Sequence, residues 1–228
     1  MISSLQFISG YPVSLQAISN KKHVFNDRIT VLFGPNGSGK TTMLRAMADA
    51  AGCCGGGWSG RYNSVITDYE IKMQWDQMPV FFQDCYADSD QSFINPDFFE
   101  SHEMLRSSGE KRIGLVNELI DHLEKKFVSY KVKYSDRPTL LLDEVDNHIG
   151  FAGQSLMWSY LFPRLSKKYQ LIISSHSIFP LLLQRRTSLR KNTIFEMAPD
   201  YIQSCINELG DAIDMYNYMS NEKESVSF

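Results

Sequence analysis

The sequence lacks the features of a membrane-embedded or secreted protein. Its apolar runs are short, as in 178–183, and fall far below the roughly 20 residues that span a bilayer. Its first residues do not show the basic-then-apolar layout of a secretory signal. It has only four cysteines and no CxxC pair, and the adjacent Cys53 and Cys54 are poorly placed for a disulfide framework. We therefore expect a cytoplasmic protein with reduced thiols and no membrane contact.

The sequence also lacks a large excess of either charge. It has 23 Lys and Arg against 26 Asp and Glu, which gives a formal net charge of −3. This balance excludes a strongly basic nucleic-acid coat but leaves a local nucleic-acid contact open. Without repeats, low-complexity tracts or a Pro- or Ser-rich linker, residues 1–220 are expected to form a single domain. The polar end, 221–228, is expected to be a disordered tail.

Short apolar segments alternate with segments of helical periodicity along the chain. The expected strands are 4–8, 12–18, 28–33, 65–75, 80–83, 139–142 and 171–174, and the expected helices are 41–51, 110–127, 155–165 and 201–219. Several of the strands are apolar throughout, which is typical of the centre of a parallel sheet covered on both faces. The pattern predicts an α/β layered fold with a mostly parallel central sheet.

A glycine-rich motif follows the strand expected at 28–33. The segment from Gly34 to Thr42 fits G-x-x-x-x-G-K-[ST] at every fixed position and precedes an expected helix, as a phosphate-binding loop requires. Glycines let successive N–H groups converge on phosphate oxygens, and the helix directs the positive end of its dipole toward them. The candidate nucleotide-binding residues here are Asn36, Gly37, Ser38, Gly39, Lys40, Thr41 and Thr42. Lys40 would neutralise the β- and γ-phosphates, and the Thr41 hydroxyl would bind Mg²⁺.

The apolar strand expected at 139–142 ends in two carboxylates, Asp143 and Glu144. The carboxyl edge of an open α/β sheet is where such folds bind their ligands. Asp143 is therefore a candidate Mg²⁺ ligand, and Glu144 is a candidate base that polarises water for attack on the γ-phosphate.

Three shorter signals have two interpretations each. Gln83 follows an apolar strand, Ser107 and Gly109 stand at the start of the expected amphipathic helix, and His176 follows another strand. Each residue is a candidate contact to phosphate or metal, and each is also a common residue of a turn, a helix cap or a strand end.

Taken in order, these motifs resemble the ATP-binding-cassette ATPase superfamily over residues 25–180. The variant signature at 106–110 and the segment 143–147 are similar to those of the AAA_15/AAA_21 group, which includes SMC-like, OLD-like and anti-phage ATPases. The resemblance implies a P-loop NTPase fold with a small N-terminal antiparallel β portion and a reduced helical lobe. Two departures concern the segment after Glu144: Val145 stands where the family usually has Pro, and Gly150 where it often has His.

The resemblance also implies ATP and Mg²⁺ as ligands, bound between two chains in a head-to-tail homodimer or heterodimer. Ser107 and Gly109 of one chain would contact the γ-phosphate held by Lys40 of the other. Glu144 would be the base, His176 and Gln83 would sense the γ-phosphate, and Gln83 would join Thr41 and Asp143 at Mg²⁺.

Three functions follow from this set. The first is an ATPase that gates an effector protein on a separate chain, in DNA maintenance or anti-phage defence. The second is the ATP-binding subunit of a membrane transporter, which the short interval between Gln83 and Ser107 disfavours because transporter cassettes carry a helical lobe there. The third is a nucleotide-dependent scaffold with little turnover, which the presence of Glu144 disfavours.

Overall fold

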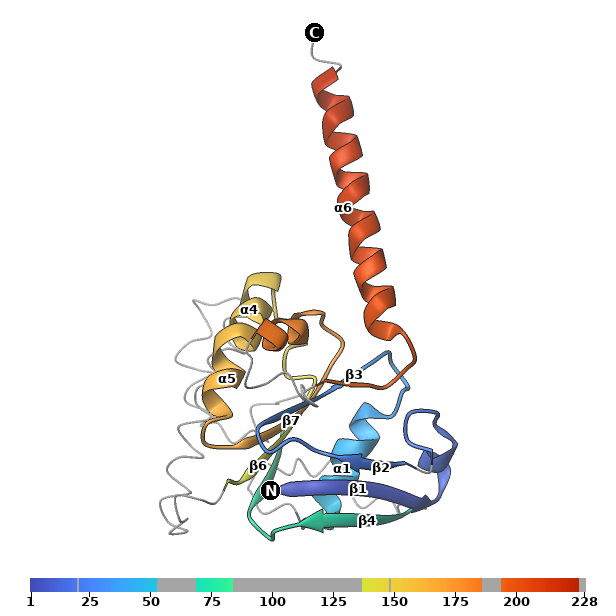
Figure 1. Ribbon diagram of the computed structural model, residues 1–228, viewed down its shortest axis with the longest axis vertical. Helices are drawn as coiled ribbons and strands as arrows, with labels where there is room; N and C mark the ends of the chain where they lie inside the picture. The colour runs from blue at the N-terminus through green and yellow to red at the C-terminus, as the bar shows by residue number, and fades with distance from the viewer. Residues whose placement is uncertain (20, 53–68, 84–136, 148, 186–193, 226–228) are drawn as a thin grey trace, which may run out of the picture.

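The computed structural model describes residues 1–19, 21–52, 69–83, 137–147, 149–185 and 194–225, and these contain two β-sheets (Figure 1). The parallel sheet contains, in order, β5 (Val80–Gln83), β6 (Thr139–Asp143), β7 (Gln170–Ser175), β3 (Ile29–Phe33) and β8 (Ile194–Glu196). The antiparallel sheet contains, in order, β2 (Lys22–Val24), β1 (Ile2–Ser9) and β4 (Glu70–Trp75). This arrangement confirms the expected α/β fold, including its small antiparallel portion near the N-terminus.

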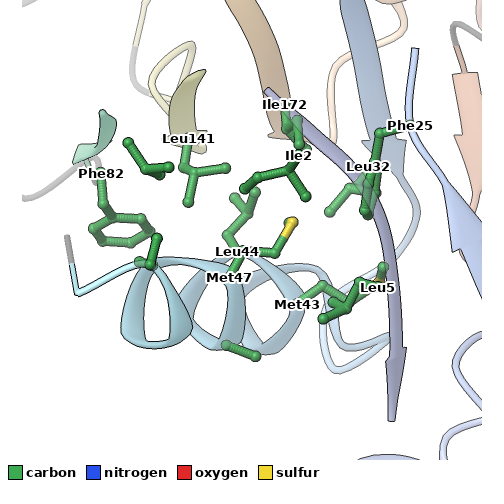
Figure 2. Packing of buried hydrophobic residues seen from close by; sticks show 14 of the residues in the cluster. Ile2, Leu5, Phe25, Leu32, Met43, Leu44, Met47, Phe82, Leu141 and Ile172 are labelled. Atoms are coloured by element: carbon green, nitrogen blue, oxygen red, sulfur yellow. The ribbon is translucent and has the colours of Figure 1, made fainter. Parts of the chain in front are cut away.

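Helices cover both faces of the parallel sheet. The helical elements are α1 (Lys40–Ala50), α4 (Phe151–Leu156), the π-helical turn η2 (Met157–Leu161), α5 (Phe162–Leu165) and α6 (Tyr201–Ser225), with 3₁₀ turns η1 (Tyr11–Ser14) and η3 (Phe179–Arg185). On one face, Leu32, Leu141 and Ile172 belong to the buried cluster that includes residues of α1 and β1, as Figure 2 shows. On the other face, alternate strand residues pack against η2 and α5. The central strands are therefore buried on both sides, which explains their uninterrupted apolar sequences.

The strand order brings distant segments together at one edge of the sheet. β7 lies between β6 and β3, so that Asp143 pairs in register with Ser174, and Phe33 pairs with Ser175. Because all neighbouring strands are parallel, their carboxyl ends meet at this edge. The loop after β3 and the turn after β6 consequently face the same two residues of β7.

The segment expected as a strand at 12–18 is not one. Gly10 has a φ angle of 95°, and Pro12 lies in the first positions of the 3₁₀ turn η1. Proline fixes its own φ and cannot donate a ladder hydrogen bond, so a turn is favoured here over an added strand. After η1, Leu15 and Ile18 contact the glycine-rich loop instead.

Two helix boundaries also differ from expectation. The helix expected at 155–165 begins at Phe151 and passes through the π-helical turn η2 just before Pro163, whose ring and missing N–H disturb regular α-helical bonding. Of the expected tail, residues 221–225 continue α6, and 226–228 lie outside the described residues. The expected helix at 110–127 lies outside the described residues, as do residues 65–68.

The last helix, α6, projects away from the two sheets (Figure 1). Its first turn is attached to the core through Tyr201, Ile202 and Cys205, which pack against the buried cluster. No helix in the described ranges is both long enough and apolar enough to cross a bilayer.

Candidate nucleotide-binding and hydrolysis site

The loop between β3 and α1 adopts a backbone that requires glycine. Gly37 and Gly39 have φ angles of 76° and 96°, in the left-handed region that residues with a Cβ avoid. A Cβ on Gly39 would lie 2.7 Å from Cδ1 of Ile18 and 2.8 Å from Cδ1 of Leu15. The motif predicted from the sequence thus forms a tightly curved loop packed on the chain that follows η1.

This loop presents polar groups suited to an anion. The Ser38 Oγ is buried and has no hydrogen-bond partner among the described residues. Gly39, the residue before α1, has no side chain with which to cap the first N–H groups of the helix. Asn36 and Gly37 are exposed at the outside of the loop. An orphaned hydroxyl beside an uncapped helix N-terminus fits a bound phosphate.

Lys40 lies folded inside the loop. Its side chain is buried, and Nζ donates to the carbonyl oxygens of Gly34 at 2.9 Å and Pro35 at 3.0 Å. Burial lowers the pKa of Lys40, and the nearby Glu144 and Asp143 carboxylates oppose this shift. Nζ lies 3.9 Å from Oε1 of Glu144. The Lys40 ammonium group is therefore held within the loop, beside the two acidic residues at the end of β6.

Thr41 and Asp143 form the oxygen-rich part of the site. The Thr41 hydroxyl donates to Oδ1 of Asp143 at 3.1 Å, and the Ser174 hydroxyl donates to the same oxygen at 2.5 Å. Burial raises the pKa of Asp143, while both hydroxyl donors act in the opposite direction. A hydroxyl and a carboxylate oxygen are donor types that Mg²⁺ accepts, usually together with phosphate and water.

Glu144 follows directly in a left-handed conformation with a φ angle of 50°. Its backbone N–H donates to the Ser174 hydroxyl at 3.0 Å, which fixes this turn to β7. Nε2 of His176 lies 2.5 Å from Oε1 of Glu144, and Nδ1 lies 3.0 Å from the carbonyl oxygen of Gly34. His176 therefore bridges the candidate base and the phosphate-binding loop.

A second carboxylate on this turn has a different environment. Asp146 is buried, and its Oδ2 accepts hydrogen bonds from Nε1 of Trp158 at 2.9 Å and Oγ of Ser175 at 2.6 Å. Burial raises the pKa of Asp146, and the two donors oppose this effect. Ser175 also accepts from the backbone N–H of Ser177 at 2.9 Å. Asp146 thus ties the turn after β6 to the segment that carries His176.

The remaining expected site residues lie on β5, on α1 or outside the described residues. Gln83 ends β5 in register with Leu142, one residue before Asp143. The Thr42 hydroxyl contacts the Tyr11 hydroxyl at 2.9 Å. Ser107 and Gly109 lie outside the described residues.

Four residues that sequence reasoning did not assign contribute to the site. Ser174 and Ser175 bind the carboxylates, Trp158 donates to Asp146, and Asp146 joins the two strand ends. One signal was available for the serines, because two hydroxyls interrupt an otherwise apolar strand just before His176. Nothing local to Trp158 indicates that its partner is twelve residues away.

A glycine-rich loop with a buried lysine, opposite a Thr–Asp pair at the carboxyl edge of a parallel sheet, defines a P-loop nucleotide-binding site. The AAA domain model, AAA_22, matches residues 22–191, and the chain belongs to this AAA domain family. The P-loop ATPase class indicated by the sequence is thereby confirmed. Among the described residues, no cluster of three or more His, Cys, Asp or Glu side chains could hold a metal by itself.

Solved structures with a similar fold include a candidate ABC transporter ATP-binding protein from Pyrococcus furiosus. It is 17% identical, with a TM-score of 0.45, and the match covers 86% of this chain and 96% of that chain. The SMC head domain from Thermotoga maritima is 16% identical, with a TM-score of 0.44, over 82% of this chain and 92% of that chain. No curated protein matches the sequence.

Proposed function

We propose that the protein binds ATP at its P-loop and hydrolyses the β–γ phosphoanhydride bond, with Glu144 as the general base. The observation that supports this most directly is the position of the Glu144 carboxylate, between Nζ of Lys40 and Nε2 of His176. It stands at the carboxyl edge of the sheet beside a loop with an orphaned hydroxyl and an uncapped helix N-terminus. A carboxylate so placed is within reach of a water that attacks a phosphate held by the loop.

Nucleotide binding would replace the hydrogen bonds of Lys40 within its own loop by hydrogen bonds to phosphate. Lys40 donates to two carbonyl oxygens of its own loop, which are neutral partners. Phosphate oxygens carry charge and form stronger hydrogen bonds with an ammonium group.

Mg²⁺ would be held by Thr41 and Asp143, with Gln83 at the end of β5 as a further ligand. When bound, the ion neutralises charge on the β- and γ-phosphates. The residues present fit this role, because the Thr41 hydroxyl and an oxygen of the Asp143 carboxylate already lie 3.1 Å apart, close enough for one ion to contact both. Ser174 also binds Oδ1 of Asp143 and would keep the carboxylate oriented.

We further propose that the ATP-bound protein acts as a cytoplasmic dimer that gates an effector protein on another chain. This part rests on the resemblance to ABC-type ATPases, in which Ser107 and Gly109 would contact the γ-phosphate bound by the other protomer. DNA maintenance and anti-phage defence are the roles that this resemblance favours. A nucleic-acid contact, if present, would belong to the same assembly.

The test is a pair of substitutions assayed by steady-state phosphate release and by calorimetry. Glu144→Gln should retain ATP affinity while turnover falls by about 10²- to 10⁴-fold, because the amide cannot accept the proton of the attacking water. Lys40→Ala should instead lose tight MgATP binding. Asp211→Asn, an exposed carboxylate on α6, is the matched control and should change neither quantity.

Wild-type turnover in Glu144→Gln would exclude Glu144 as the base. Negligible turnover in the wild type, with normal ATP binding, would favour the scaffold. Light scattering of Glu144→Gln with and without MgATP tests the head-to-tail dimer, because association should be stronger with MgATP than without it. Retention of the wild type in the membrane fraction of native cells would favour a transporter subunit.

A further inference from the structure

An apolar stripe follows α6 from the core into solvent. Its members are spaced alternately by four and three residues: Ile202, Ile206, Leu209, Ile213 and Tyr216. Ile202 packs against the buried cluster, whereas Ile206, Leu209 and Ile213 are 43%, 42% and 52% exposed. This spacing is that of the a and d positions of a coiled coil, which form a seam against a partner helix. The stripe thus continues the protein core along one side of α6, the helix that projects from the sheets in Figure 1.

The charged residues of α6 up to position 220 lie away from this stripe. Glu208, Asp211 and Asp214 are exposed, and positions 201–220 contain no Lys or Arg. In the heptad set by the stripe, these acids fall on the opposite side of the helix. A membrane-surface helix requires basic residues on its polar face, so this helix is unsuited to a lipid surface.

The positions that border the stripe are uncharged. Cys205, Ala212 and Met219 follow one edge, and Gln203, Gly210 and Asn217 follow the other. Charges at these bordering positions normally select or reject a partner helix. Their absence means that no like charges would face each other if the stripe met a copy of itself. A partner helix with Lys or Arg at its bordering positions would find no acidic residue to pair with at the bordering positions of α6.

The helix also needs a partner for its own stability. Gly210 lies in its interior, has open space where a Cβ would stand, and weakens a helix relative to other residues. Residues 211–219 are all exposed. Helices in proteins are stabilised mostly by packing of their apolar face, and Ile213 and Tyr216 on that face pack against neither buried cluster of the described residues.

We propose that α6 pairs with α6 of a second copy of this chain along the stripe, as a symmetric two-helix coiled coil. The same patch meets itself, as in the closed two-fold interfaces that most homodimers use. The exposed part, from Ile206 to Met219, is roughly 20 Å long. A two-helix contact of that length buries less than the about 1,600 Å² of a standard stable interface, so the dimer should be reversible and concentration-dependent. The pairing requires no nucleotide and goes beyond the proposed ATPase activity.

The experiment compares two glutamate substitutions on opposite faces of α6 by sedimentation velocity without nucleotide, over a concentration series. Ile213→Glu places a charge in the seam and should weaken the dimer by about tenfold or more. Met215→Glu, at a residue that is 61% exposed, introduces the same charge two positions later and should leave the dimer unchanged. Because position 215 is four residues from Asp211, any helix loss from repulsion should be larger in this control than in Ile213→Glu.

Self-pairing is overturned if the wild type stays monomeric at every concentration, or if both variants dimerise as the wild type does. It is also overturned if a different protein co-purifies with a monomeric wild type and is lost in Ile213→Glu, because the stripe would then belong to that protein. Leu209→Ser, with far-UV circular dichroism of each variant, gives a second test without added charge. Lys40→Ala should keep the nucleotide-free dimer, so failure of this proposal and failure of the ATPase proposal are distinguishable.

Discussion

Two carboxylates on one turn, Glu144 and Asp146, have opposite surroundings. The Glu144 side chain is 21% exposed and contacts two side chains that can be charged, Lys40 and His176. Asp146 is 3% exposed and accepts hydrogen bonds from two neutral donors, Trp158 and Ser175. Only one residue separates them, but they differ in exposed fraction and in whether their partners can be charged.

This difference predicts that Glu144 acts in catalysis, whereas Asp146 stabilises the fold. The partners of Glu144 have alternative partners of their own, because Lys40 and His176 also contact the backbone of the phosphate-binding loop. The partners of Asp146 are buried groups that would lose their hydrogen bonds if the carboxylate left. Replacement of Glu144 should therefore act mainly on turnover, and replacement of Asp146 mainly on stability.

The largest effect expected from this comparison is on the free energy of unfolding of Asp146→Ala. The substitution leaves the Trp158 N–H and the Ser175 hydroxyl without their acceptor, and we expect a loss of about 3 kcal/mol. Urea unfolding measures it, with Glu144→Gln as the control, for which a loss of about 1 kcal/mol or less is expected. Equal losses in the two variants would contradict the division between the carboxylates.

A smaller effect is expected on the pH dependence of stability. Burial raises the pKa of Asp146, so the folded state binds more protons than the unfolded state between the ordinary and the raised value. Stability should consequently fall as pH rises through that window. Asp146→Asn should make this fall shallower without abolishing it, because burial also raises the pKa of Asp143. Unfolding free energies measured from about pH 4 upward test this, and parallel curves for the variant and the wild type would contradict it.

The smallest effect concerns the backbone of Glu144. Its φ angle of 50° is left-handed, a conformation that costs about 1 kcal/mol for residues with a Cβ. Glu144→Gly should therefore be more stable than Glu144→Ala by about 0.5–1 kcal/mol, although both should be inactive. The same pair at Asp211, in the middle of α6, should show the reverse order because glycine weakens a helix. Thermal unfolding of the four variants would detect the sign change, and the same order at both positions would exclude backbone strain.

Much of the fold could be predicted from local pattern alone. Apolar runs located β3, β5, β6 and β7, and helical periodicity located α1 and α6. Those signals are strong because each strand is buried on both faces and each helix has a recognisable composition. The strand predicted at 12–18 was wrong, since apolar residues of this segment pack against the glycine-rich loop and do not join a sheet.

The residues of the candidate site also differ in how far local sequence could predict them. Gly37, Gly39 and Lys40 were identifiable because their backbone conformation and charge are local requirements of a phosphate-binding loop. His176 and Gln83 were weak signals singly, because each needs a partner from another strand. The structure brings His176 to Glu144 and leaves Gln83 at the same edge of the sheet.

By itself, the sequence determined the identity of the loop, the acids at the end of β6 and the helical character of residues 201–219. Only the tertiary structure decided that β7 lies between β3 and β6, which turns Ser174 and Ser175 into partners of Asp143 and Asp146. It also decided that the stripe of α6 from Ile206 onward remains uncovered by the described residues. Local sequence fixes backbone conformation and the burial of each segment, whereas strand order depends on contacts between segments far apart in the chain, which no local pattern encodes.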